Sequence, residues 1–324
     1  MKRILFWGNY RENSGPSNVH RSLIENSNNE LDYIHFKNRY LRALEIRFKV
    51  WLSDIIIYPS YTPTKEVVWF KSLKKKTVTI VHGCQTYENL VNDLGRDQKQ
   101  LAENEDKIHE LSDVIVCVSE KFSIWYKERY PKYASKITFV NNGIKIQPRN
   151  QIEKIPYLVA VSGGNRPIKN NNLVCQAIQK LNKEGFNCQL KIFGQHDCHN
   201  EDLSRYPFAT YMNQLNKKEY HEWLDRIPLF VLVSKFETFG LVVADAINCH
   251  CSILLSNNIG ASSILRLNEE DTIANPHNIE ELANKIRYLL ESPNTDRLLS
   301  SINIEACTKK QAWINLKSIC DNLE

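Results

Sequence analysis

The chain has 324 residues, a length that favours two domains of about 150 residues each over a single core. With 42% hydrophobic and 24% charged residues and no apolar run near the roughly 20 residues that span a bilayer, the composition is typical of a soluble globular protein and excludes a transmembrane one. The net charge of +5 arises within residues 37–76, which contain ten Lys and Arg but three Asp and Glu. The apolar segment at the start is too short for a signal peptide, so we expect a cytoplasmic protein.

Strand and helix patterns alternate from the first residue onward. Short apolar runs predict buried strands, and helical patterns separate them, the longest covering residues 88–110. A helix is expected to begin near Ser17, as its N-cap. The strands expected in the first half are Arg3–Trp7, Leu31–Phe36, Asp54–Tyr58, Val78–His82, Val114–Val118 and Ile137–Asn141. This alternation predicts an α/β fold with a doubly wound, mostly parallel sheet.

A polar segment with two prolines, residues 143–156, is expected to be a linker to a second alternating series. The strands expected there are Tyr157–Ser162, Gln189–Phe193, Phe208–Tyr211, Leu229–Val233, Ser252–Leu255 and Asp271–Ala274. Helices follow most of them, and the last 30 residues have a helical pattern. Two Rossmann-like domains, residues 1–147 and 148–304, would then face each other across a cleft lined by the loops at the carboxyl ends of both sheets.

The nine cysteines lie in strand and helix patterns and include no Cys-x-x-Cys pair, so we expect reduced and mostly buried thiols. Two short clusters, residues 196–199 and 249–251, contain side chains that can bind metals. Neither cluster has a second pair at the spacing of a structural zinc site. We therefore expect no metal.

Residues 234–246 form the most informative motif. They follow an apolar run and precede a helical pattern that begins near Leu241, so they lie where a strand turns into a helix, a position at which open α/β sheets bind ligands. Gly240 lets the backbone approach a bound group, and the helix N-terminus suits a phosphate. Glu237 and Asp245 are separated by at most about 12 Å of helix, so their carboxylates could hold hydroxyls at the two ends of a sugar nucleotide.

This motif resembles the Glu-x7-Glu signature of the retaining glycosyltransferases of family 4, which have the GT-B fold, although the second Glu is Asp245 here. An ordinary strand–turn–helix with one solvated and one half-buried acid would have the same local pattern. The resemblance implies that Glu237 holds hydroxyls of a donor sugar and that Asp245 holds the ribose. The other donor contacts that it implies are at Thr238, Phe239, Gly240 and Leu241.

A second segment of the same kind follows the strand expected at Tyr157–Ser162. Gly163 and Gly164 allow close backbone approach, and Arg166 and Lys169 lie at a helix start. Both cations can stabilise the charge that a nucleoside diphosphate acquires as it leaves, Arg through a forked contact and Lys as a point charge. A solvated basic turn is the alternative. Family 4 enzymes have an Arg and a Lys here with similar spacing, which implies that both take part in catalysis.

Four further positions match the family. The loop containing Gly194 lies near the nucleotide base in relatives, and Met212 falls where their backbone groups hold that base. Gly15 follows the first strand and could let the backbone approach a phosphate or an acceptor, although relatives have more glycines there. His82 matches the strand-end His of the family, which shields the positive charge that develops at the anomeric carbon. A structural histidine is the alternative for His82.

The chain departs from the family pattern after the central motif. His250 stands where relatives usually have Gly, and residues 259–263 replace a Gly-Gly-x-x-Glu loop. The pattern returns at Trp313, which resembles the start of the final helix of GT-B proteins. That helix crosses back to the first domain, and the resemblance implies the same for residues 305–324. The resemblance covers nearly the whole chain and is strongest at residues 114–256.

The resemblance implies a retaining transferase that moves a hexosyl or related group from a nucleotide-diphosphate sugar, which we expect to be a UDP-sugar, to a hydroxyl acceptor. The expected acceptor is a glycan or a lipid-linked intermediate of cell-surface polysaccharide synthesis. This fold class needs no metal, since Arg166 and Lys169 supply positive charge. The alternative is a non-catalytic partner subunit that binds an active transferase or a protein acceptor, which Asp245 and His250 would favour. A GT-B epimerase would need further acids and histidines in the cleft.

Residues 37–76 mix basic side chains with aliphatic and aromatic ones at helical spacing, most clearly within residues 39–52. A basic amphipathic face can lie on an anionic bilayer, so peripheral contact with the inner face of the cell membrane is one expectation. A core-packed helix with a solvated basic edge is the other. The sequence contains no known nucleic-acid reader motif, so we expect no nucleic-acid partner.

Overall fold

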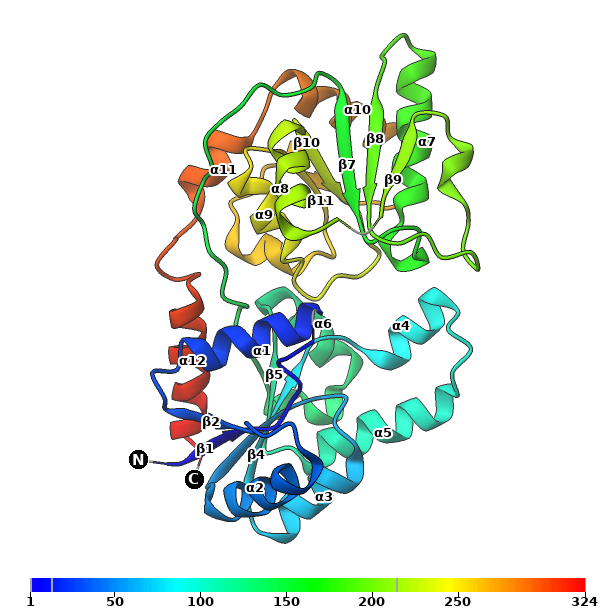
Figure 1. Cartoon of the computed structure of the whole chain (residues 1–324). Helices are drawn as coiled ribbons and strands as arrows, with labels where there is room; N and C mark the ends of the chain where they lie inside the picture. Colours follow the sequence, from blue (N-terminus) through cyan, green and yellow to red (C-terminus); the bar gives the residue numbers. More distant parts are fainter. Residues whose placement is uncertain (1, 13, 214, 324) are drawn as a thin grey trace. The chain divides into compact units, whose positions relative to one another are not determined.

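The computed structural model describes residues 2–12, 14–213 and 215–323. The chain divides into two compact units: unit 1 comprises Met1–Ile144 and Glu305–Glu324, and unit 2 comprises Lys145–Ile304. Each unit is built on one parallel sheet with flanking helices (Figure 1). The two sheets confirm the predicted α/β class, and each of the twelve expected strands is present among the described residues.

The described residues of unit 1 form a six-stranded sheet with the strand order β2-β1-β3-β4-β5-β6. Every residue of β3 is buried, as a parallel strand covered on both faces requires. The strands are β1 (Ile4–Phe6), β2 (Leu31–Tyr33), β3 (Ile55–Pro59), β4 (Lys76–Val81), β5 (Val114–Cys117) and β6 (Ile137–Phe139). The helices are α1 (Gly15–Glu25), α2 (Arg39–Leu52), α3 (Thr64–Ser72), α4 (Gln85–Asn92), α5 (Gln98–Leu111), α6 (Glu120–Arg129) and α12 (Lys309–Asp321), with the 3₁₀ helix η1 (Pro131–Lys136).

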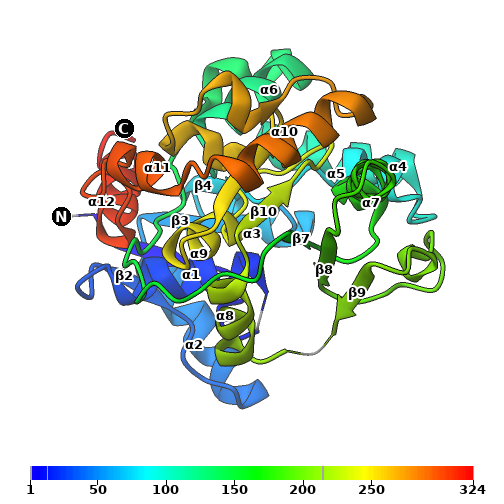
Figure 2. The ribbon, with the colours of Figure 1, turned by 90° about the horizontal axis from the view of Figure 1, so that it is seen from above.

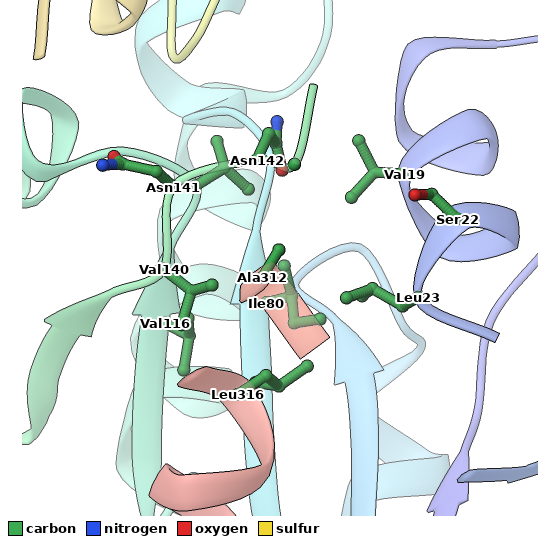
Figure 3. Close-up of a pocket in the computed structure, with 12 residues that line it drawn as sticks. Val19, Ser22, Leu23, Ile80, Val116, Val140, Asn141, Asn142, Ala312 and Leu316 are labelled. Carbon is green, nitrogen blue, oxygen red and sulfur yellow. The ribbon is translucent and has the colours of Figure 1, made fainter. Parts of the chain in front are cut away.

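The C-terminal helix α12 belongs to unit 1, although all of unit 2 precedes it in the chain. It lies beside α1 in both views of the molecule (Figures 1 and 2). Trp313 is only 2% exposed, and its indole nitrogen donates a hydrogen bond of 3.1 Å to the carboxylate of Glu30. Ala312 and Leu316 line a cavity of about 20 Å³ together with Leu23 of α1 (Figure 3). The helix therefore completes the core of unit 1.

The described residues of unit 2 form a second six-stranded sheet, with the order β12-β11-β10-β7-β8-β9. Its strands are β7 (Leu158–Ser162), β8 (Gln189–Phe193), β9 (Ala209–Met212), β10 (Leu229–Leu232), β11 (Ser252–Ser256) and β12 (Thr272–Ile273). Its helices are α7 (Asn171–Lys183), α8 (Lys217–Arg226), α9 (Val242–Asn248), α10 (Ile279–Glu291) and α11 (Thr295–Ser301). Its 3₁₀ helices are η2 (Pro167–Lys169), η3 (Leu203–Arg205), η4 (Gly260–Ile264) and η5 (Glu269–Asp271).

Each sheet has a point at which the strand order reverses. In unit 2 the chain runs from β7 through β8 to β9 on one side, and β10, β11 and β12 continue on the other side of β7. In unit 1, β2 lies on one side of β1, and β3 to β6 lie on the other. Ligands of open α/β sheets bind outside the carboxyl ends of the strands at such a switch point. The loops after β7 and β10, and those after β1 and β3, are therefore the positions at which a site is expected.

The helix predicted at residues 88–110 is in fact two helices, α4 and α5. Asp93 and Gly95 adopt left-handed φ angles of 49° and 65° after the end of α4. Asp97 then caps α5, because its side chain accepts two backbone amides of the first turn. The helical pattern of the sequence thus spans two helices, and the left-handed backbone at Asp93 and Gly95 separates them.

Two other helix predictions are corrected in the same way. Helix α1 begins at Gly15 and not near Ser17, because Ser14 is the N-cap and accepts the amide of Ser17 at 3.3 Å. The last 30 residues are not helical throughout, because residues 302–308 separate α11 from α12, where Thr308 is the N-cap. Among the described residues, no helix combines the length and the apolar character that a membrane span requires.

Candidate functional site

Two residues predicted from separate motifs meet at the switch point of unit 2. Lys169 ends η2 in the loop after β7, and Glu237 lies in the loop after β10. The Lys169 ammonium forms an ion pair and hydrogen bond with the Glu237 carboxylate. The two side chains are 12% and 18% exposed, so the pair is mostly buried. Ligands of open α/β sheets bind at such a switch point, where an ammonium can donate to anionic groups and a carboxylate can accept from hydroxyl groups.

Asparagines at the start of α7 hold the Lys169 loop in place. The side-chain amide of Asn171 donates to the carbonyls of Ser162 and Gly164 at 3.1 and 2.7 Å. Asn170 has a left-handed φ of 57°, and its amide donates to the carbonyl of Pro276 at 2.9 Å. Sequence reasoning missed both residues. Their signal was the asparagine run directly after Lys169, since Asn tolerates left-handed φ and hydrogen-bonds nearby backbone.

The predicted glycines of this site have a packing role. Gly163, Gly164 and Gly194 have φ angles of 93°, 63° and 117°, and the amides of Gly163 and Gly164 both donate to the carbonyl of Phe193. A Cβ on Gly164 would lie 2.0 Å from the carbonyl oxygen of Gln195. The glycines therefore let the loops after β7 and β8 pack backbone against backbone.

Arg166 differs from Lys169, although both belong to one loop. Its side chain is exposed, and its Nε donates to the carbonyl of Gly163 at 3.3 Å. Lys169 lies close to Gly163, because a Cβ there would meet the Lys169 methylenes at 2.6–2.9 Å. The Lys169 ammonium is thus held within the site, whereas the Arg166 side chain is exposed to solvent on the same loop.

The main chain around Glu237 is anchored to the segment that departs from the family pattern. The Glu237 amide donates to the Asn258 carbonyl at 3.1 Å, and its own carbonyl accepts the Gly260 amide at 3.0 Å. The next residues, Thr238 to Leu241, form the turn into α9. Gly240 there has a φ of 92°, and the buried Phe239 accepts the Ala261 amide through its carbonyl. Residues 258–261 therefore hold the predicted motif through backbone hydrogen bonds.

Asp245 lies in the first turn of the short helix α9, and His250 follows the end of that helix. The Asp245 carboxylate is 3.5 Å from Nε2 of His221, which comes from α8, and it is 40% exposed. His250 follows the helix with a left-handed φ of 55°, and its Nε2 lies 2.8 Å from the Arg149 carbonyl. Glycine adopts that conformation without strain, so Gly suits this position. His250 adopts the same left-handed conformation, and the fold accommodates it.

The remaining donor-side prediction, Met212, ends β9 and is half-buried. In the sheet it is paired with Phe193, the residue before Gly194, so Met212 and Gly194 share the carboxyl edge of neighbouring strands. After Gly194, the ligand-type atoms of Asp197, Cys198 and His199 lie within 4.8 Å of one another, but all three residues are exposed and no other such group occurs among the described residues.

His82 lies in unit 1 directly after β4, next to a second histidine. Its Nε2 is 2.8 Å from Nε2 of His20, which comes from α1, and His20 Nδ1 is 2.7 Å from the carbonyl oxygen of Asn9. Burial lowers the pKa of His20 to about 4, and burial followed by the neighbouring His20 lowers the pKa of His82 well below its ordinary value. Gly15 is the exposed first residue of α1. Sequence reasoning missed His20.

A pocket of about 470 Å³ lies at the switch point of unit 1. The loops after β1 and β3 line it together with residues of α2 and α3. Its wall contains the aromatic side chains of Trp7, Tyr10 and Tyr61 and the charged ones of Arg42 and Glu66. The Trp7 indole donates to the Glu66 carboxylate at 2.6 Å. Aromatic faces beside charged hydrogen-bonding groups suit a polar ring-shaped ligand.

Comparisons with known proteins show the family and the fold of the chain. The model of the family described as glycosyl transferases group 1 matches residues 144–305, half of the chain. A comparison with curated protein sequences gives no match.

Solved structures resemble the whole chain. HepE from Anabaena, in complex with UDP-glucose, has a TM-score of 0.72 and 12% identity with both chains fully covered. Sucrose-phosphate synthase from Thermosynechococcus elongatus has a TM-score of 0.73 and 16% identity over 98% of both chains. The lipopolysaccharide outer core galactosyltransferase WaaB has a TM-score of 0.68 and 15% identity over 99% of both chains. These likenesses show the fold, which is GT-B. Together with the family match, they establish that the chain belongs to the glycosyl transferases group 1.

Proposed function

We propose that the protein transfers a sugar from a UDP-sugar to a hydroxyl acceptor with retention of anomeric configuration. The observation that carries this proposal is the ion pair of Lys169 and Glu237 at the β7–β10 switch point. A nucleotide-diphosphate sugar has the chemistry that both members require, since its diphosphate matches the ammonium and its sugar hydroxyls match the carboxylate. HepE, a structural neighbour, was solved with UDP-glucose, which supports the choice of nucleotide.

The ion pair of Lys169 and Glu237 suggests how the donor binds. Before binding, each charge is compensated by the other, so neither is buried alone. The donor diphosphate then takes hydrogen bonds from Lys169, and Glu237 accepts hydroxyl groups of the sugar. Arg166, exposed on the same loop, adds a second cation for the leaving diphosphate. Because negative charge grows on that diphosphate as the glycosidic bond breaks, both cations stabilise the transition state more than the ground state.

Among the other predicted donor residues, Met212 ends β9, and the rest belong to segments that follow β7, β8 and β10 of the unit 2 sheet. We assign the ribose to Asp245, the phosphates to the backbone from Thr238 to Leu241, and the base to the loops at Gly194 and Met212. The leaving phosphate assists attack of the acceptor on the same face of the sugar, so no protein nucleophile is required. Arg166 and Lys169 supply the positive charge that a metal would otherwise supply, and we expect no metal requirement.

The acceptor is proposed to be a glycan or a lipid-linked saccharide that enters at unit 1. The aromatic and charged pocket at the unit 1 switch point supports a saccharide. Helix α2 supports a membrane surface, because it lines that pocket with Arg42 and Ile46 and exposes large apolar side chains elsewhere. These side chains are 48% to 78% exposed and belong to Tyr40, Leu41, Leu44, Phe48 and Trp51. With the basic residues of the same segment, they fit an anionic bilayer.

The donor assignment is tested by calorimetric titration with UDP, GDP, ADP and UDP-sugars. We expect saturable binding of one UDP-sugar, weakened by about 10- to 100-fold in Arg166→Ala, because a hydrogen bond to a charged group contributes roughly 1.5–3 kcal/mol. Arg226→Ala is the matched control, since Arg226 is also exposed but lies before β10, at the opposite end of that strand. A donor that binds then allows an acceptor screen, with the anomeric configuration of the product read by NMR.

A specific outcome would favour the partner subunit instead. If the folded protein binds none of these nucleotides, the donor site is wrong. A non-catalytic partner of an active transferase would then be the better assignment, and capture of the chain with such a transferase would be the next measurement.

A further inference from the structure

The pocket at the unit 1 switch point has polar groups that already have partners within its wall. The Arg11 guanidinium donates to the main-chain carbonyls of Ile34 and His35. One carboxylate oxygen of Glu66 accepts the indole N–H of Trp7 at 2.6 Å. Arg11 is therefore occupied in holding the loop after β1 to the segment after β2, and its N–H groups are directed at carbonyls of the protein.

Other polar groups of the same wall have no hydrogen-bond partner among the described residues. They are the guanidinium of Arg42, the second carboxylate oxygen of Glu66 and the hydroxyls of Tyr61 and Thr62. Arg42 comes from α2 and is exposed, whereas the other three come from the segment after β3 and from α3. A ligand in this pocket therefore meets one cation without an ion pair, together with oxygens that can bond hydroxyl groups.

The remaining charged residue of the wall is Glu12. Burial, and after it the charge of Glu12, raises the pKa of Tyr61, which places that carboxylate near the Tyr61 ring. Glu12 and Glu66 thus both accompany the part of the wall that contains Tyr61. Arg42 is the cation that remains for a ligand, since Arg11 is bonded to main-chain carbonyls.

We propose that this pocket binds an anionic saccharide, with its acidic group on Arg42 and its hydroxyls on Glu66 and Tyr61. The inference rests on the proposed transfer reaction and deepens it, because it assigns the acceptor a phosphate or a carboxylate beside the sugar ring that the pocket holds. A guanidinium makes forked, charge-assisted contacts with either group. The faces of Trp7 and Tyr61 suit the apolar face of a sugar ring.

The test measures binding of small saccharides to the full chain by ligand-observed NMR. The probes are the methyl glycosides and the 1-phosphates of glucose and galactose, together with glucuronate and galacturonate. Excess UDP is present, so that sugar phosphates do not occupy the donor site proposed in unit 2. A preference confined to the 1-phosphates would assign a phosphate-linked acceptor, and a preference confined to the uronates would assign an acidic sugar.

We expect at least one anionic probe to bind about tenfold more tightly than the methyl glycoside of its sugar, because a charge-assisted contact is added. Arg42→Gln should abolish this preference and leave the affinity for methyl glycosides within about twofold. Arg47→Gln is the matched control, since Arg47 is an exposed arginine of the same helix that does not line the pocket, and it should change neither affinity. Tyr61→Ala should weaken all bound probes by about tenfold.

Equal affinity for neutral and anionic probes would overturn the inference, and so would a preference that survives in Arg42→Gln. An equal loss in Arg47→Gln would also overturn it, because the effect would then come from the general charge of α2. If no probe binds, the saccharide site is wrong, while titration with UDP-sugars decides the donor site separately. If UDP-sugars do not bind but the preference due to Arg42 is present, the transfer reaction fails and the saccharide site remains.

Discussion

At the scale of single residues, substitutions of Lys169 and Arg166 should differ in their effect on the free energy of unfolding but not in their effect on UDP binding. Lys169→Met leaves the Glu237 carboxylate mostly buried without its cation, so we expect the free energy of unfolding to fall by about 2–4 kcal/mol. Arg166→Ala removes an exposed side chain and should change that free energy by no more than about 0.5 kcal/mol. Both changes should weaken UDP binding by at least about tenfold.

Denaturant unfolding and calorimetry measure the two effects on the same samples. The double variant Lys169→Met/Glu237→Gln removes both charges and should recover most of the lost stability, although it should not recover UDP affinity. Equal loss of stability in Arg166→Ala and Lys169→Met would contradict the difference in burial. Unaltered UDP affinity in Lys169→Met would remove it from the donor site.

The sequence predicted that Lys169 and Glu237 belong to one site, because each lies in a loop that follows a strand expected in the second domain. It did not predict that they contact each other, because direct contact depends on the order of β7 and β10 in the sheet, which spacing does not reveal. Asp245 shows the same limit: its neighbour His221 comes from another helix. His20 was missed because its partners Asn9 and His82 are assembled only by the fold.

At the scale of elements, strands were predictable and helix ends were not. A strand covered on both faces must be apolar along its length, so runs such as Ile55–Pro59 stand out in the sequence. Helix ends depend on one or two residues with special φ angles. Asp93 and Gly95 interrupt an otherwise continuous helical pattern in this way.

Helix α2 illustrates an element for which the sequence left two interpretations. Its buried residues are Glu45 and Val50, and Ile46 packs against the same core, so the core face is narrow and most of its large aromatic and aliphatic side chains lie outside it. Burial raises the pKa of Glu45, but hydrogen bonds from the Phe36 and His35 amides and the Lys49 ammonium outweigh it and hold the pKa below the ordinary value. The helix is therefore anchored through Glu45, Ile46 and Val50 and exposes most of its other large apolar side chains, which favours the membrane interpretation.

A vesicle assay tests that surface. Sedimentation with vesicles containing anionic lipid should retain the protein, and vesicles of zwitterionic lipid should retain much less. Phe48→Glu/Trp51→Glu should reduce binding by at least about tenfold, since each side chain loses roughly 1.5–3 kcal/mol of apolar burial. Tyr288→Glu is the matched control, because Tyr288 is an exposed aromatic residue of unit 2. Equal binding by all three proteins, or no dependence on anionic lipid, would exclude a membrane face on α2.

At the scale of the whole molecule, the two units repeat one construction. Each has a six-stranded parallel sheet among its described residues and one switch point, and each switch point holds a candidate ligand position. The two units differ in how the chain forms them. Unit 2 is one continuous segment, whereas unit 1 includes α12, which follows unit 2 in the sequence. The core of unit 1 therefore depends on residues from both ends of the sequence.

This dependence predicts where a single core substitution acts. Leu316 is 1% exposed and lines the cavity of about 20 Å³ next to α1, so Leu316→Ala enlarges a void that already exists (Figure 3). We expect a loss of about 3–5 kcal/mol from unit 1. Amide hydrogen exchange should accelerate in β1, β4 and β5 but not in unit 2, and UDP affinity should be unchanged. Leu289→Ala, an equally buried leucine of α10, should do the reverse. Accelerated exchange throughout both units in Leu316→Ala would show instead that they unfold as a single cooperative body.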